Sequence, residues 1–272
     1  MTLSDSAIPR TAQVLAVANQ KGGVGKTTTA INLSTGLAEA GYRCLVIDLD
    51  PQGNASTGLD SPSESRERTT YDALSDTSTM EEVIRPTSVE NLMLAPASVD
   101  LAAIDVELVD DQQRAQRLKR LIEQPQGLRT AYDYILIDCP PSLNLLTVNA
   151  MVAADAILVP LQCEFFALEG LSQLLATIRR VQQSLNPSLR IAGIVLTMYD
   201  RRNRLSAQVA EDVRANLGDV VFQTVIPRNV RLSEAPSHAL PALIYDPSCS
   251  GSQAYRALAA EIAGRQRADS AA

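Results

Sequence analysis

A glycine-rich loop follows the first apolar run of the chain. The run is Val14-Leu15-Ala16-Val17-Ala18, and residues 21–28 read Lys-Gly-Gly-Val-Gly-Lys-Thr-Thr. Glycines let backbone N–H groups turn inward around phosphates, while a lysine binds the β- and γ-phosphates and a Thr hydroxyl ligates Mg²⁺. Lys26 and Thr27 match these last two roles. The loop residues predicted to bind nucleotide are Lys21, Gly22, Gly23, Val24, Gly25, Lys26, Thr27 and Thr28.

The loop carries one lysine more than phosphate binding requires, namely Lys21. The usual pattern G-x-x-x-x-G-K-[ST] fails at its first position, which is Gln20. The alternative interpretation is a Gly-rich turn that caps an ordinary helix. It is disfavoured because a strand pattern precedes the loop and a helical stripe follows it, so the loop and the helix N-terminus together form an anion site. A second cation at the mouth of that site needs a role of its own.

Length and composition predict one large domain. The chain has 272 residues, of which 46% are hydrophobic, and this suffices for a single α/β core. We expect the domain to span 13–264, with flexible tails at 1–12 and 265–272. The polar stretch 61–70 is interpreted as a surface loop. No apolar run approaches the ~18 residues of a membrane span, and the four cysteines are widely spaced. A cytoplasmic protein with reduced thiols is therefore expected.

The net charge of −7 argues against a surface covered in basic patches. A local patch remains open, because Arg201, Arg202 and Arg204 lie within four residues. The alternative is an ordinary solvated face, since residues 200–234 hold six arginines against five acidic residues. Charge alone leaves the two interpretations balanced.

The pattern of apolar runs predicts a doubly wound α/β fold, with a mostly parallel sheet and helices on both faces. The runs are continuous rather than alternating, as expected for strands covered on both sides. Helical patterns cover 27–40, 100–123, 144–153, 167–185, 204–216 and 252–263. The predicted strands are Val14–Ala18, Cys44–Ile47, Leu92–Ala95, Tyr134–Ile137, Ala156–Val159, Ile191–Leu196 and Val220–Ile226.

Ligands of such folds bind at the carboxyl ends of the strands, and polar residues gather there. Asp138 ends the run Ile135-Leu136-Ile137 and is predicted to hold Mg²⁺, directly or through water. Its alternative role is to cap the helix that follows. Asp48 and Asp50 end another strand, and their spacing of two points both side chains to the same face.

The two aspartates receive different predictions. Asp50 is predicted to orient the water that attacks the γ-phosphate, because Pro51-Gln52-Gly53 can turn the chain back over the site. Asp48 either supports the metal shell or simply forms a turn, and the sequence favours neither. No Asn-Lys-x-Asp motif is present, so ATP is expected rather than GTP.

Four segments together resemble the ParA/Soj chromosome-partitioning ATPases, which belong to the deviant Walker A group that includes MinD. The resemblance extends from Val14 to Ile262 and departs at Ala239, where the family usually has glycine. The segments are residues 21–28, Asp48-Leu49-Asp50-Pro51-Gln52-Gly53-Asn54, Asp138-Cys139-Pro140-Pro141-Ser142 and Ile226-Pro227-Arg228-Asn229-Val230-Arg231-Leu232-Ser233-Glu234-Ala235-Pro236-Ser237-His238.

The resemblance implies a Mg²⁺-dependent ATPase that dimerises around ATP. Lys21 would be the signature lysine that reaches the phosphates of a partner subunit, and Lys26 would hold phosphate in its own subunit. Thr27 would ligate Mg²⁺ and Asp50 would position water. Pro227 and Asn229 would lie at the adenine. A ParB-type protein is expected to stimulate hydrolysis.

The resemblance also implies DNA binding, through Arg202 and Arg231. Such contacts go to phosphates of double-stranded DNA, so they carry no sequence preference and depend strongly on salt. A dimer would present them side by side, which explains how an acidic protein binds DNA only with ATP. Arg204 is a further candidate from the same arginine cluster. The expected location is the nucleoid.

Several alternatives remain at this stage. A MinD-like membrane ATPase needs a C-terminal amphipathic helix with a basic face, and residues 263–272 lack one, so no membrane binding is expected. An iron–sulfur reductase is disfavoured because no cysteine lies between Cys44 and Cys139. The remaining alternatives are a ParA-like ATPase that positions a protein cargo, and a DNA-coating scaffold in which ATP is only a conformational ligand.

Overall fold

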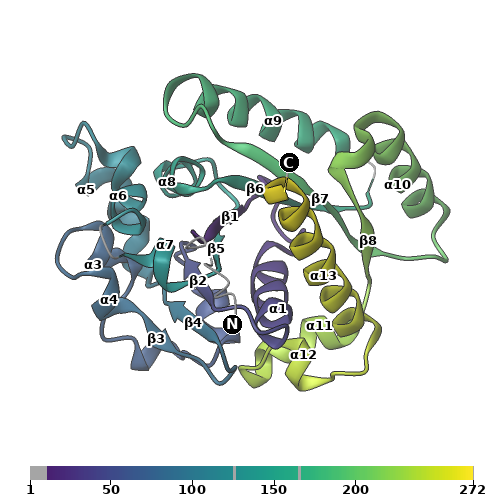
Figure 1. The fold of residues 1–272 in the computed structure, drawn as a ribbon, viewed down its shortest axis with the longest axis horizontal. Helices are drawn as coiled ribbons and strands as arrows, with labels where there is room; N and C mark the ends of the chain where they lie inside the picture. Colours follow the sequence, from purple (N-terminus) through teal and green to yellow (C-terminus); the bar gives the residue numbers. More distant parts are fainter. Residues whose placement is uncertain (1–10, 125–126, 165–166, 272) are drawn as a thin grey trace, which may run out of the picture.

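The computed structural model describes residues 11–124, 127–164 and 167–271. Within these residues the chain forms one sheet of eight strands in the order β3-β4-β2-β5-β1-β6-β7-β8 (Figure 1). β3 is antiparallel to β4, and the other pairings are parallel. The predicted doubly wound fold is confirmed. The strands are β1 (Gln13–Val17), β2 (Cys44–Asp48), β3 (Arg85–Pro86), β4 (Leu92–Ala95), β5 (Tyr134–Asp138), β6 (Ala156–Gln162), β7 (Arg190–Tyr199) and β8 (Val221–Pro227).

Helices cover both faces of the sheet, because successive strand side chains point to opposite sides. Leu15 and Val17 of β1 are buried with α1 (Lys26–Glu39) and α13 (Ser250–Ala271). Val14 and Ala16 are buried in a second core, with α8 (Leu145–Ala153) and α9 (Ala167–Ser184). Figure 1 shows the strands between these two helix layers. The seven predicted strands are all present, and the two-residue strand β3 was missed.

The single helical pattern predicted over 100–123 is wrong. Short helices with turns between them replace it, and Asp111 gives the physical reason. Its carboxylate accepts the backbone N–H of Gln113 and the Nε of Arg117, a local alternative to helical hydrogen bonds. The remaining α-helices are α2 (Asn54–Gly58), α3 (Thr70–Leu74), α4 (Met80–Val83), α5 (Ile104–Glu107), α6 (Arg117–Ile122), α7 (Leu128–Ala131), α10 (Arg204–Leu217), α11 (Val230–Glu234) and α12 (Ala242–Tyr245).

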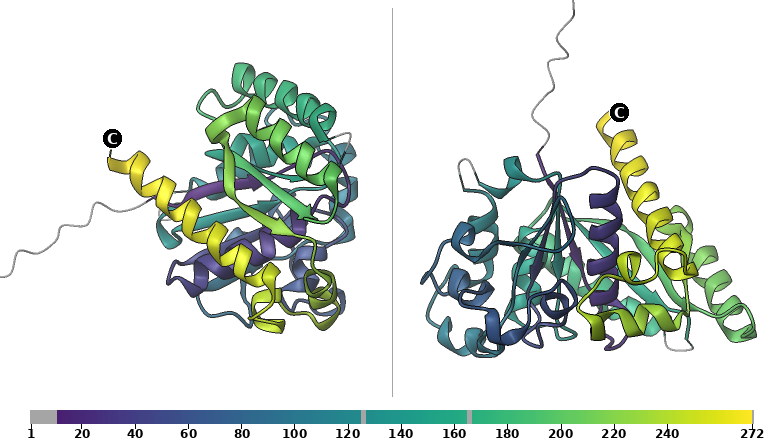
Figure 2. Two further views of the ribbon diagram at one scale, coloured as in Figure 1. Left: turned by 90° about the vertical axis from the view of Figure 1, so that its right-hand side faces the viewer. Right: turned by 90° about the horizontal axis from the view of Figure 1, so that it is seen from below.

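Parts of both predicted tails lie within the described residues. Of the N-terminal tail, residues 1–10 lie outside the described residues, and Ala12 is already buried, with its N–H donating to the carbonyl of Arg129. The segment predicted as a C-terminal tail is helical as far as Ala271. It remains helical because Arg265 stacks on Phe222 at 4.2 Å and Arg267 donates to the hydroxyl of Tyr42. In both views of Figure 2 the end of α13 projects past the strands.

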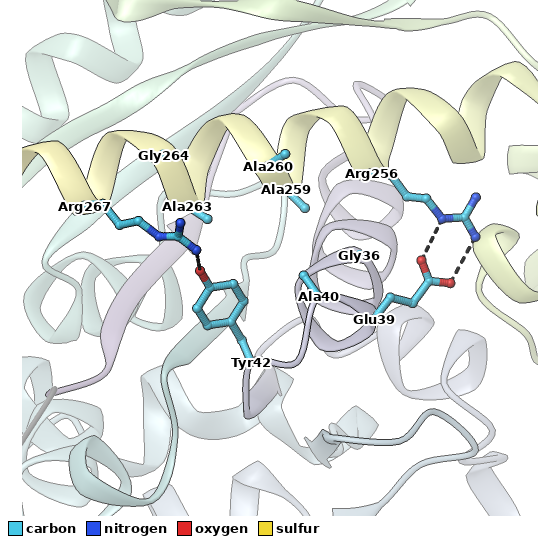
Figure 3. A pocket seen from close by; sticks show the side chains of 10 residues that line it. All are labelled: Gly36, Glu39, Ala40, Tyr42, Arg256, Ala259, Ala260, Ala263, Gly264 and Arg267. Carbon is cyan, nitrogen blue, oxygen red and sulfur yellow. Dashed lines mark hydrogen bonds and ion pairs between the residues drawn. The ribbon is translucent and has the colours of Figure 1, made fainter. Parts of the chain in front are cut away.

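A groove lies between α1 and α13. Small residues line it, and at these residues the two helices approach each other. Its volume is about 460 Å³, and Gly36 lies on α1 opposite Ala259 of α13 (Figure 3). An ion pair between Glu39 and Arg256 at 2.7 Å joins the two helices at one end. No helix among the described residues has both the length and the apolarity to cross a membrane.

Candidate active site

The glycine-rich loop joins the carboxyl end of β1 to α1. Gly23 and Gly25 have φ values of 74° and 88°, in the left-handed region where a side chain is disfavoured. Gly25 is the N-cap of α1, so the loop leads directly into free N–H groups at a helix N-terminus. The hydroxyl of Thr197, near the end of β7, donates to the carbonyl of Val24 at 2.9 Å. A strand two places from β1 in the sheet therefore fixes the loop.

Lys26 lies inside the loop and is 6% exposed. Its Nζ donates to the carbonyl of Lys21 at 3.2 Å. Burial lowers the pKa of Lys26, while the nearby charges of Asp138 and Asp50 oppose that shift. A buried cation at a helix N-terminus, with carboxylates close by, suits a polyphosphate that carries Mg²⁺.

Asp138 is fully buried at the end of β5, between Val17 of β1 and Asp48 of β2. Neither carboxylate oxygen accepts a hydrogen bond from any described residue. Burial and the charge of Asp48 raise the pKa of Asp138 well above its usual range, against the effects of Thr27 and Lys26. A buried carboxylate beside the Thr27 hydroxyl and the Lys26 ammonium fits a nearby cation or its water shell, so the residues present suit Mg²⁺.

Mg²⁺ needs few protein ligands, because it keeps several waters and binds substrate phosphates. Thr27 and Asp138 would hold it here. Within the described part of the chain, no group of three or more His, Cys, Asp or Glu side chains has the arrangement of a metal site.

Asp48 has structural partners for both of its oxygens. Oδ2 accepts the N–H and the hydroxyl of Ser56 at 2.8 and 2.6 Å, and Oδ1 accepts the N–H of Asp50 at 3.1 Å. Burial raises the pKa of Asp48 to about 6, although these hydrogen bonds oppose the shift. The geometry favours the turn-forming interpretation of Asp48 over its predicted metal role.

Asp50 follows β2 and is 7% exposed. Its Oδ1 accepts the N–H of Gln52 at 3.0 Å, and its carbonyl accepts the N–H of Gly53 at 2.8 Å. These bonds form a tight turn in which Gly53 has a φ of 62°. The turn brings the carboxylate close enough to Lys26 and Asp138 to act electrostatically on both. Asp50 therefore lies in the same cluster as Lys26.

The extra lysine of the loop forms an exposed ion pair. Lys21 Nζ lies 2.6 Å from Oε2 of Glu164, and these side chains are 39% and 50% exposed. Glu164 also accepts a short hydrogen bond from Gln162 Nε2. Sequence reasoning missed Glu164, although it follows the carboxyl end of β6, where the strand-end rule predicts chemistry.

The predicted adenine residues lie at the end of β8. Pro227 is its last residue and Asn229 is the N-cap of α11, with its Oδ1 accepting the N–H of Arg231 at 2.8 Å. Asn229 Nδ2 donates to the hydroxyl of Ser250 at 2.9 Å. The side chain thus has a structural role, and adenine contact remains a prediction.

The arginine candidates lie on adjacent segments at one edge of the sheet. β7 and β8 pair in parallel, and the N–H of Arg228 donates to the carbonyl of Tyr199 at 3.0 Å. The β7–α10 connection carries Arg202, and α10 begins at Arg204; both are exposed. Arg231 on α11 is paired with Glu234 at 2.8 Å and Asp246 at 3.3 Å. Glu234 raises its pKa.

The chain is similar to proteins of known sequence and structure. The family model described as an AAA domain matches residues 12–191. The chain is 58% identical over 255 residues to the chromosome partitioning protein ParA of Caulobacter vibrioides strain NA1000, covering 94% of this chain and 95% of the relative.

Two further matches support the same grouping. The chain is 51% identical over 251 residues to the sporulation initiation inhibitor protein Soj of Bacillus subtilis, covering 92% of this chain and 98% of Soj. Its fold is similar to a crystal structure titled cobyrinic acid a,c-diamide synthase of Mycobacterium smegmatis with bound ADP and magnesium. That match has a TM-score of 0.78 and 37% identity, and it covers 91% of this chain and 92% of the other.

Proposed function

The chain belongs to the ParA/Soj family of chromosome-partitioning ATPases, and on that premise we propose that it is an ATP-dependent switch on DNA. ATP joins two subunits, the dimer binds double-stranded DNA without sequence preference, and hydrolysis to ADP and phosphate releases it. A ParB-type protein accelerates hydrolysis. The ATP-bound dimer would therefore be found on the nucleoid.

Nucleotide binding rests on the loop and on Lys26. Backbone N–H groups of the loop and the start of α1 would donate to the phosphates, and Lys26 would bind the β- and γ-phosphates. Thr27 and Asp138 would hold Mg²⁺. When bound, the metal supplies charge neutralisation between the β- and γ-phosphates. Its fit is supported by the Asp138 carboxylate, whose oxygens accept no hydrogen bond from described residues.

Hydrolysis requires a group that holds the attacking water. We assign this role to Asp50. The support is its position in the Asp50–Gly53 turn beside Lys26 and Asp138, where the residue is 7% exposed. Asp50 would accept a hydrogen bond from the water and orient it in line with the γ-phosphate. The reaction is expected to be slow without DNA and the ParB-type protein.

Dimerisation is assigned to Lys21. The exposed position of its ammonium group is the observation that carries the proposal. A lysine that served its own phosphate site would point inward like Lys26. Instead its ammonium group lies at the loop surface beside Glu164, available to a second subunit. The phosphates of a partner's ATP offer more negative charge than one exposed carboxylate, so the lysine would exchange partners when two subunits meet.

DNA binding is assigned to Arg202 and Arg231, with Arg204 as a further contact. These residues belong to adjacent segments at the ends of β7 and β8. Each subunit would contribute a small number of phosphate contacts. Dimerisation would double the number of these contacts in one complex with DNA. An acidic protein would then bind DNA appreciably only as the ATP-bound dimer.

ATP turnover with DNA and the ParB-type protein is the test that separates this switch from its alternatives. The wild-type chain should hydrolyse ATP, and Asp50→Ala should bind ATP yet hydrolyse it at least about 100-fold more slowly. Absence of turnover in the wild type would favour the DNA-coating scaffold. Turnover that does not respond to DNA would favour a ParA-like ATPase acting on a protein cargo.

A further inference from the structure

Arg66 lies in the polar stretch 61–70, which the sequence marks only as a surface loop. Its guanidinium is half-buried and turned back onto the chain. Nε and Nη2 donate to the carbonyl of Ser61, at 2.9 and 2.6 Å, and Nη1 donates to the carbonyl of Ala97 at 3.0 Å. Nη2 also donates to the carbonyl of Gly53 at 3.2 Å and to the hydroxyl of Thr57 at 2.9 Å.

Three of these four residues, Gly53, Thr57 and Ser61, belong to the segment that follows Asp50. Gly53 closes the Asp50 turn, because its N–H donates to the carbonyl of Asp50, and it is also the N-cap of α2. Thr57 lies on α2 and Ser61 follows it. Arg66 therefore connects the segment 53–61 with Ala97, which lies after β4.

The contact with Gly53 is close enough to constrain that residue. A Cβ added to Gly53 would lie 2.3 Å from Arg66 Nη1, and the φ of 62° at Gly53 already disfavours a side chain. The guanidinium thus occupies the space beside the turn. Displacing it would remove one of the hydrogen bonds to the Gly53 carbonyl, which also accepts the N–H and the hydroxyl of Thr57 at 3.0 and 3.2 Å, and would open space beside the Asp50 turn.

The hydrogen bonds of Asp48 to the same segment do not involve Gly53. Asp48 holds Ser56 through two hydrogen bonds, and Ser56 lies within α2 rather than at the turn. Arg66 itself is braced from behind, since Arg85 on β3 donates to the carbonyls of Ser65 and Arg68 at 3.0 and 2.9 Å. These hydrogen bonds hold the backbone on both sides of Arg66.

We propose that Arg66 is a positioning residue for ATP hydrolysis: it holds the Gly53 end of the turn so that the Asp50 carboxylate keeps the direction needed to orient water. The inference rests on the proposed role of Asp50. Planar guanidinium geometry is essential to it, because a lysine ammonium cannot reach Gly53, Ser61 and Ala97 together. A small displacement of a water-positioning group lowers turnover without weakening substrate binding.

The test compares Arg66→Ala, Arg66→Lys, Asp50→Ala and the control Arg68→Ala. Arg68 is the matched control because it comes from the same segment and forms an exposed pair with Glu82. ATP affinity is measured with a fluorescent ATP analogue and Mg²⁺, and turnover with γ-labelled ATP and double-stranded DNA. Hydrogen exchange reports on the amides of residues 52–59.

Both Arg66 variants should lose turnover by about ten-fold or more while ATP affinity changes by less than about two-fold. Exchange at residues 52–59 should become faster, and Arg68→Ala should match the wild type. The inference is overturned if either Arg66 variant keeps wild-type turnover, or if ATP affinity falls together with turnover. A wild type without turnover, or an active Asp50→Ala, would instead contradict the proposed function itself.

Discussion

The ammonium of Lys21, at the start of the glycine-rich loop, lies 2.6 Å from the carboxylate of Glu164. The pair joins the loop after β1 to the segment after β6, and both side chains are substantially exposed. An exposed ion pair contributes about 0–1 kcal/mol, so it orients the lysine without trapping it. Lys21 is therefore held in the subunit by a contact weak enough to exchange.

Removing that contact should favour the dimer. Glu164→Gln is expected to tighten ATP-dependent dimerisation by up to about five-fold, the equivalent of an exposed ion pair that no longer has to be broken. Sedimentation with a slowly hydrolysed ATP analogue measures it. Glu169→Gln, an exposed acid on α9, is the matched control and should not change the dimer. Weaker dimerisation of Glu164→Gln would contradict this account of the pair.

Asp138→Asn should stabilise the protein in the absence of Mg²⁺ and nucleotide. The pKa of Asp138 is raised in the fold, so the folded state binds its proton more tightly than the unfolded state does. Ionisation therefore costs stability, and that cost is absent below the ordinary carboxyl pKa of about 4 and grows as pH rises. Urea unfolding should show the advantage of the variant increasing from about pH 4 to neutral pH.

With Mg²⁺ and ATP bound, the wild type should be more stable than Asp138→Asn. The wild type gains stability from ligand binding through its charged carboxylate, and Asp138→Asn should gain less. A variant that is less stable than the wild type without ligand would show that Asp138 has a structural partner in the fold.

Arg231 should contribute one phosphate contact per subunit to DNA binding. Arg231→Ala is expected to weaken binding of the ATP form and to lower the salt slope by about one per subunit. Glu234 and Asp246 compete with DNA for this guanidinium, so Glu234→Gln should strengthen binding by up to about five-fold at low salt. Fluorescence anisotropy against salt concentration measures both.

Arg120→Ala is the control for the DNA measurement, because Arg120 is exposed on α6, far from α11 (Figure 1). It should leave the salt slope unchanged. If Arg120→Ala and Arg231→Ala lower the slope equally, DNA binding depends on overall charge and the assignment to Arg231 is wrong.

The close approach of α1 to α13 at Gly36 should disfavour a large side chain at that position. A Cβ there would lie 3.2 Å from the Cβ of Ala259 and 3.4 Å from the carbonyl of Tyr255. Gly36→Leu is expected to lower the free energy of unfolding by about 1–3 kcal/mol through overpacking. Gly264→Ala is the control, since nothing lies within 4 Å of an added Cβ and alanine favours the helix by up to ~1 kcal/mol. Urea unfolding of the two variants should shift in opposite directions.

Much of the fold could be predicted because its local signals agree. The strands β2 and β5 are continuous apolar runs that end at aspartates, and β1 is a continuous apolar run after Gln13; buried parallel strands require such runs. The helix predicted over 100–123 failed because Asp111 forms local side-chain bonds that apolar spacing does not reveal. Ala239 adopts a φ of 54°, the left-handed conformation that a glycine would favour there.

The site was predictable only where its chemistry is local in sequence. The loop around Lys26 and the acid Asp138 follow from strand ends and motif spacing. The partners of Lys21 and Arg66 could not be found in this way, since Glu164 is 143 residues from Lys21 and Arg66 binds mostly carbonyl oxygens. Any residue type provides a carbonyl, so such contacts leave no sequence pattern.

The most direct test of the switch is DNA binding by the wild type and by Lys21→Ala, measured with ATP, with ADP and without nucleotide. The wild type should bind double-stranded DNA tightly only with ATP, and Lys21→Ala should bind weakly in all three states while still binding ATP. Equal DNA affinity of the wild type in all three states, or tight ATP-dependent binding by Lys21→Ala, would contradict a dimer closed by this lysine.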